Sequence, residues 1–128
     1  MKAITANLIV ESIEDCLPFW GERLGFARTV EVPHGDKIGF VILKHGDTEL
    51  MLQSRASIAD DVAGLGGETF RSTLYIEVAQ LAPIRKALTG WARVVPERST
   101  PYGAREIIVR DPAGNVVLFS SRDPADLA

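Results

Sequence analysis

The sequence predicts an α+β fold of two tandem βαβββ modules, whose curved mixed sheets enclose a cleft and carry their helices on the outer faces. One observation is a repeat, in which the strand that ends at Val10 matches the strand that ends at Val78, an offset of about 68 residues. A second is that each strand is followed by a helical pattern ending at a glycine, Gly25 or Gly90. The third is an Asp-Pro-x-Gly-Asn turn at 111–115 that delivers the chain into a last apolar strand. Because one βαβββ unit cannot cover both faces of its sheet, two units are expected to pair.

Length and composition set the class of protein. The chain has 128 residues, of which 46% are hydrophobic and 24% charged, which is ordinary for a single globular domain spanning 1–128. We place module 1 at about 1–54, a linker at about 55–70 and module 2 at about 71–122. The net charge is −3 and the basic residues are scattered, so neither a nucleic-acid nor a membrane partner is indicated.

Cysteine usage and the start of the chain bear on the compartment. Cys16 is the only cysteine, which excludes an intrachain disulfide, and its place on an apolar helix face predicts a buried, inert thiol. The chain begins directly with a strand and contains no signal-peptide core and no apolar run of membrane-spanning length. We therefore expect a soluble cytoplasmic protein.

Module 1 begins with a strand at 4–10, in which Leu8 and Val10 alternate with polar neighbours. Helical spacing over 13–24 follows and ends at Gly25. Pro18 is tolerated only in a first turn, which moves the expected start of the regular helix toward Asp15. Three strands complete the module, and they are expected at about 28–32, 37–44 and 48–53.

Module 2 repeats this order. A strand at 72–78 precedes a helix at about 81–89, which Gly90 closes. Its remaining strands are expected at about 92–95, 105–110 and 116–121. The intervening 55–70 is rich in Gly, Ala and Asp and is expected to be a flexible connection.

Three motifs carry a resemblance to a known family. They are Leu17-Pro18-Phe19-Trp20-Gly21-Glu22-Arg23-Leu24-Gly25-Phe26 in the first helix, Tyr102-Gly103-Ala104-Arg105-Glu106, and the turn and strand from Arg110 to Phe119. Together with the paired modules, they resemble the vicinal oxygen chelate superfamily, the glyoxalase/bleomycin-resistance/dioxygenase fold. In its metal-using members, the first and last strands of each module each supply one metal ligand facing the cleft. The matching positions here are Thr5, Met51, Thr73 and Leu118.

These four positions predict a metal-free protein without a cofactor. Two hydroxyls, a thioether and an isobutyl group cannot replace the imidazole and carboxylate donors that a divalent catalytic metal requires. Shifting the strands by two residues offers at most one carboxylate, because the positions then become Asn7, Glu49 or Gln53, Tyr75 and Ser120. The histidines, His34 and His45, each precede a Gly-Asp turn and are expected to be solvent-exposed.

Strand alternation predicts which side chains face the cleft, and the polar ones among them suggest a ligand site. Glu106 is preferred to Arg105 because it is in phase with Ile108. Trp20 is expected in the core, and Trp91 at a dimer surface. The candidate ligand-binding residues are Asn7, Glu49, Met51, Gln53, Tyr75, Glu77, Glu106 and Leu118, and no catalytic residue is assigned. The alternative is that Glu49 and Glu77 are solvated at strand edges and that Tyr75 only packs.

The leading functional hypothesis is a metal-independent small-molecule binding protein resembling the bleomycin-resistance branch, which sequesters a drug or metabolite. Carboxylates would then meet a cationic or hydrogen-bonding ligand, and Tyr75 or Trp20 would offer a stacking surface. The alternative is a lyase, isomerase or dioxygenase with a displaced metal site, or with Glu49 or Glu106 as a general base. A third reading is an interaction module without a ligand. The resemblance also implies a homodimer.

Overall fold

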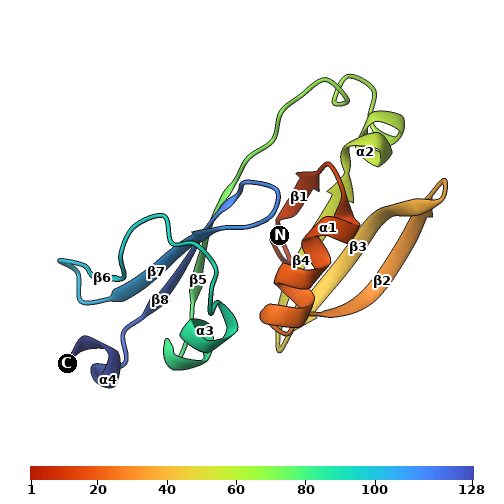
Figure 1. Ribbon diagram of the computed structural model, residues 1–128. Helices are drawn as coiled ribbons and strands as arrows, with labels where there is room; N and C mark the ends of the chain where they lie inside the picture. The colour runs from red at the N-terminus through yellow and green to blue at the C-terminus, as the bar shows by residue number, and fades with distance from the viewer. The chain divides into compact units, whose positions relative to one another are not determined.

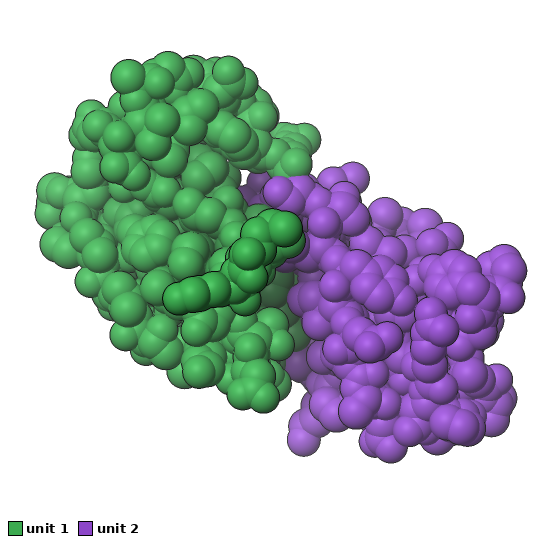
Figure 2. Space-filling model, turned by 180° about the vertical axis from the view of Figure 1, so that it is seen from behind, with its two compact units in different colours: residues 1–71 green, residues 72–128 purple.

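The computed structural model describes residues 1–128 and divides into two compact units, residues 1–71 and 72–128, coloured separately in Figure 2. Each unit contains one four-stranded mixed sheet (Figure 1). The strand order is β1-β4-β3-β2 in sheet 1 and β5-β8-β7-β6 in sheet 2. The strands of the two sheets are connected in the same order, so the predicted α+β fold with tandem modules is confirmed.

The first unit contains four strands and three helical segments. In each βαβββ unit the first strand runs parallel to the last, and the other paired strands are antiparallel. The elements are β1 (Asn7–Val10), α1 (Ile13–Leu17), the π-helix η1 (Pro18–Arg23), β2 (Ala27–His34), β3 (Lys37–His45), β4 (Thr48–Ser54) and α2 (Arg55–Asp61). The three strands expected after the first helix are therefore present and slightly longer than predicted.

The first helix begins earlier than expected. The Ser12 side chain caps it by accepting the Asp15 N–H at 3.3 Å, so α1 starts at Ile13 rather than near Asp15. Pro18 is accommodated because the helix changes there from α to π geometry, and η1 continues to Arg23. Gly25 then adopts a φ of 81°, which ends the helix as the sequence predicted.

The core of the first unit lies between sheet 1 and the helix α1–η1. Trp20 is completely buried, and its ring meets those of Phe19 and Phe26 edge to face at centroid distances of 5.1 and 5.5 Å. Cys16 is also buried, so the expected core position of Trp20 and the expected burial of Cys16 are confirmed. The strand residues buried against this helix are Leu8, Val10, Val41, Leu43, Leu50 and Leu52.

Part of the predicted linker is a helix. Ser54 caps α2 by accepting the Ser57 N–H at 3.1 Å, and Ile58 is buried on the first unit. His34 is hydrogen-bonded to Asp60 across a 2.6 Å N–O distance, which ties α2 to the end of β2. Only the glycine-containing stretch beyond Val62 is irregular, as expected.

The second unit contains β5 (Thr73–Glu77), α3 (Ala82–Ala87), β6 (Arg98–Ser99), β7 (Arg105–Arg110), β8 (Val116–Ser121) and α4 (Pro124–Leu127). Strands β5, β7 and β8 confirm the expected strands within one residue. The predicted strand at 92–95 is wrong: only an isolated bridge joins Arg93 to Val109 there. Pro96 has no N–H to continue a ladder, and pairing resumes at β6.

The core of the second unit lies between sheet 2 and α3. Leu81 and Leu88, which flank α3, are fully buried. They lie over the buried strand residues Ile107, Val109, Val117 and Phe119. Outside this core, Glu97 accepts hydrogen bonds from Arg85 at 2.8 Å and from Arg105 at 2.6 Å. In neither unit is any helix long and apolar enough to cross a bilayer.

Candidate functional site

Each sheet has one face that the helices leave uncovered, called here its open face. The open face of sheet 1 is mainly apolar. Register places side chains on it in rows across the strands, so that Met51 lies between Asn7 and Ile42, and Gln53 lies between Ile9 and Phe40. These two rows end on the edge strand β2, at Val30 and Val32, which are 43% and 47% exposed.

Two amide side chains mark one end of this face. Asn7 donates its Nδ2 to Gln53 Oε1 at 3.0 Å, and Gln53 donates to Ser57 Oγ of α2 at 3.1 Å. Gln53 is buried, whereas Asn7 is exposed. The predicted residues Asn7, Met51 and Gln53 are therefore neighbours, while Glu49 lies exposed farther along β4, opposite Lys44.

The open face of sheet 2 has an apolar middle and a polar end. Tyr75 and Leu118 are direct partners in the parallel pair β5–β8, and Ile108 is the next residue in that row. The adjacent row crosses all four strands and is polar. It consists of Glu77, Ser120, Glu106 and Arg98, and is called here the polar row.

Glu106 is the centre of the polar row, with its side chain completely buried. Its Oε1 accepts from Arg98 Nε at 3.1 Å and its Oε2 accepts from the Tyr102 hydroxyl at 2.8 Å. The hydrogen bond to Glu106 raises the pKa of the Tyr102 phenol. A buried carboxylate is tolerated because both oxygens are paired.

Tyr75 lies beside this cluster, and its hydroxyl donates to Ser120 Oγ at 2.7 Å. Tyr75, Glu77, Glu106 and Leu118 therefore share the open face of sheet 2, as alternation predicted. Sequence reasoning missed Arg98 and Tyr102 as members of the cluster. Arg98 lies in a two-residue strand without periodicity, and Tyr102 lies in a turn, so no alternation pointed to either.

Four positions of this chain correspond to the metal ligands of the metal-using vicinal oxygen chelate proteins, and their side chains do not suit a metal. Thr5 precedes β1, Met51 lies in β4, Thr73 begins β5 and Leu118 lies in β8. None carries an imidazole or a carboxylate, so their donor set does not fit a divalent cation. Elsewhere, no three His, Cys, Asp or Glu side chains are grouped to hold a metal ion. His34 is bound to Asp60, and His45 packs on Phe26.

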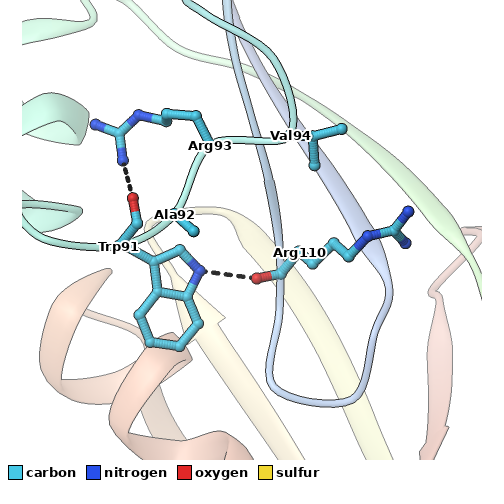
Figure 3. A pocket seen from close by; sticks show the side chains of 5 residues that line it. All are labelled: Trp91, Ala92, Arg93, Val94 and Arg110. Carbon is cyan, nitrogen blue, oxygen red and sulfur yellow. Dashed lines mark hydrogen bonds between the residues drawn. The ribbon is translucent and has the colours of Figure 1, made fainter.

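A separate pocket of about 430 Å³ lies beside the end of β7 (Figure 3). The indole nitrogen of Trp91 donates to the Arg110 carbonyl oxygen at 2.8 Å, and Arg93 donates to the Trp91 carbonyl oxygen at 2.7 Å. Ala92 and Val94 complete its lining. The Trp91 indole nitrogen and the Arg93 guanidinium thus bond within the wall, while the Arg110 guanidinium donates to the Gly114 carbonyl oxygen outside it at 3.3 Å.

Comparison with known proteins establishes the family. The glyoxalase/bleomycin resistance protein/dioxygenase superfamily model matches residues 3–119, and the chain belongs to this superfamily. A comparison with curated protein sequences found no match.

Solved structures share the fold at low identity. TioX from Micromonospora sp. ML1 is 20% identical, with a TM-score of 0.76 over 95% of this chain and 99% of its own. The bleomycin-binding protein of Streptomyces verticillus, solved with copper(II)-bleomycin, is 24% identical, with a TM-score of 0.62 over 94% and 96%. Lactoylglutathione lyase from Agrobacterium tumefaciens is 18% identical, with a TM-score of 0.73 over 94% of each chain. These similarities show a common fold.

Proposed function

We propose that this protein binds a small organic molecule without a metal and without transforming it, in the manner of a drug- or metabolite-sequestering protein of the superfamily. The observation that carries the proposal is a contrast between the open faces of the two sheets and the four positions that correspond to metal ligands. The open faces present apolar surface with a few fixed polar groups, while the four ligand positions hold no metal donor. The superfamily's description and the bleomycin-binding protein of the same fold support antibiotic resistance as the biological context that we propose.

The candidate residues divide by role. Met51, Tyr75 and Leu118 supply apolar or aromatic contact area on the two open faces. The exposed Asn7, Glu49 and Glu77 are available for hydrogen bonds or for a cationic group on the ligand. Gln53 and Glu106 already have internal partners, so their contribution is to hold the neighbouring side chains in place. We also propose that the protein is cytoplasmic and forms a homodimer. The molar mass measured by light scattering during gel filtration would test the homodimer.

Thermal-shift screening tests the proposal. Glycopeptide-type antibiotics, polyamines and aromatic amines are added singly, and at least one class is expected to raise the Tm. The matched variants are Leu118→Lys, on the open face of sheet 2, and Val62→Lys, which replaces an exposed apolar residue after α2. The shift should be lost or reduced in the first variant and kept in the second. A failure of every compound class would contradict the proposal.

Elemental analysis of the purified protein separates this proposal from the enzyme alternative. Protein purified without chelator is expected to carry no stoichiometric Zn, Ni, Mn or Fe, and the Tm is expected to be unchanged by these ions or by EDTA. A bound metal at a stoichiometry near one would overturn metal independence and favour a lyase or dioxygenase.

A further inference from the structure

The chain contains two tyrosines, and both lie at the same polar row of sheet 2. Each is about half exposed, Tyr75 at 51% and Tyr102 at 55%. Exposed tyrosines usually direct their hydroxyl groups into water. Here each hydroxyl instead donates to a buried side chain of the sheet, Ser120 or Glu106.

The anchoring points of the two hydroxyls are adjacent. Tyr75 donates to Ser120 Oγ at 2.7 Å, and Tyr102 donates to Glu106 Oε2 at 2.8 Å. Ser120 and Glu106 are direct partners in the antiparallel pair β7–β8. The two hydroxyls are therefore anchored at neighbouring points of one sheet face, although the rings come from different parts of the unit, β5 and the turn before β7.

The position of Tyr102 is fixed by its turn as well as by its hydroxyl. Thr100 accepts the Ala104 N–H through its Oγ at 3.1 Å, and the Thr100 N–H donates to the Ala104 carbonyl oxygen at 2.8 Å. Gly103 has a φ of 80°, which closes the turn. A ring held at both its backbone and its hydroxyl loses little further freedom when a ligand stacks on it.

The charge of Glu106 is neutralised within the protein. Arg98 pairs with its Oε1, and Tyr102 occupies its Oε2. A ligand stacked on Tyr102 therefore meets a balanced ion pair rather than an isolated carboxylate, and the exposed carboxylate of the polar row, Glu77, lies two strands away from Glu106 on β5. At Tyr102 this favours an uncharged planar group over a cation.

We propose that Tyr75 and Tyr102 form a preorganised stacking surface for a planar aromatic or heteroaromatic ring of the ligand, with Glu106 as a positioning residue that orients Tyr102. The inference rests on the proposed function, because it names the chemical class of the ligand bound at the open face of sheet 2. It assigns Glu106 an indirect role: the carboxylate holds the aromatic surface and does not touch the ligand.

Fluorine NMR tests this directly, because 3-fluorotyrosine labelling gives two resonances, which Tyr75→Phe and Tyr102→Phe assign. The probes are 2-naphthamide, benzamide and cyclohexanecarboxamide, with tetramethylammonium as the cation. Both resonances are expected to shift with one common Kd, more tightly for 2-naphthamide than for benzamide. The saturated amide and the cation should leave both resonances unmoved at the same concentrations.

Two variants test the positioning role. Tyr102→Phe keeps the ring and removes its anchor, and is expected to weaken 2-naphthamide binding about 3- to 10-fold. Glu106→Gln should weaken binding similarly and also move the pH titration of the Tyr102 resonance toward lower pH, which general destabilisation would not do. An unchanged Tyr102 titration, or unchanged affinity in both variants, would overturn the role of Glu106.

The outcomes separate this inference from the proposed function. If other compounds raise the Tm while the aromatic amides leave both resonances unmoved, the stacking surface is wrong and small-molecule binding stands. A shift of only one resonance, or an equal response to the saturated amide, also overturns the stacking surface. If no compound raises the Tm and no resonance moves, both proposals fail.

Discussion

Asn115 and Asp111, the two ends of the β7–β8 turn, are joined through both side chains. The Asp111 carboxylate accepts the Asn115 backbone N–H at 2.8 Å through Oδ1 and the Asn115 Nδ2 at 3.0 Å through Oδ2. Asn115 then accepts the Ser72 N–H through Oδ1 at 2.8 Å, just before β5 begins. Both residues are buried, so one turn fixes three strands of sheet 2.

Asn115→Ala is therefore expected to destabilise the protein by about 1–3 kcal/mol, because it leaves buried partners unsatisfied. The matched control is Asn7→Ala, which removes an exposed asparagine with a single hydrogen bond to Gln53 and should cost about 1 kcal/mol or less. Urea unfolding of both variants measures the difference. Equal losses would show that the Asn115 amide is not a structural link.

The Glu97 carboxylate makes the free energy of unfolding depend on pH in the acidic range. Hydrogen bonds from Arg85, and then from Arg105, lower its pKa from 4.5 to about 2. Since the folded pKa lies below the unfolded one, the carboxylate stabilises the protein above pH 4.5, and this contribution is lost as the pH falls toward 2.

Glu97→Gln is accordingly expected to lower the free energy of unfolding by about 1–2 kcal/mol at pH 7. The gap between wild type and variant should narrow as the pH falls from 4.5 to about 2. Thermal or urea unfolding across this range measures it. A gap that stays constant with pH would rule out the ion-pair explanation.

Close packing around Gly39 predicts a steric effect. A Cβ at this position would lie 2.6 Å from the Cβ of His34 and 3.3 Å from that of Ser57. Gly39→Ala is expected to cost about 1–3 kcal/mol, since backbone or helix α2 must move. At Gly67 a Cβ would meet nothing within 4 Å, so Gly67→Ala is the matched control and should be neutral or slightly stabilising. Similar unfolding midpoints for the two variants would contradict the packing at Gly39.

The single thiol reports on the integrity of the first core. Cys16 is 2% exposed in α1, so a thiol reagent such as 5,5′-dithiobis(2-nitrobenzoic acid) should react with it only when the core opens. The expected result is slow labelling of the native protein and immediate labelling in denaturant, measured by absorbance. Fast labelling without denaturant would mean that α1 separates readily from sheet 1.

Regular elements could be predicted from the sequence because their side chains obey a period. The final strand and the helix end at Gly25 were found in this way, and alternation placed Glu106 on the same face as Ile108. The helix α2 was missed because its glycine- and alanine-rich neighbourhood indicates a linker. Its stability comes from the Ser54 cap and from long-range contacts such as His34 with Asp60.

The candidate site was predictable as a surface but not as a network. Tyr75 and Leu118 follow from the two-residue period of adjacent strands. The partners of Glu106 come from a two-residue strand and a turn, where side-chain direction depends on tertiary contacts. A prediction that Glu106 faces the open side therefore does not reveal that Arg98 and Tyr102 occupy its oxygens.

The repeated strand order of the two sheets has an evolutionary consequence. All strand pairs of sheet 1 lie within residues 1–71 and all those of sheet 2 within residues 72–128, so no backbone ladder crosses the boundary. A genetic crossover between related genes in the glycine-bearing segment 62–71 would exchange one half intact. Each half could then diversify its own open face independently, and new binding preferences could arise by shuffling halves instead of by accumulating point changes.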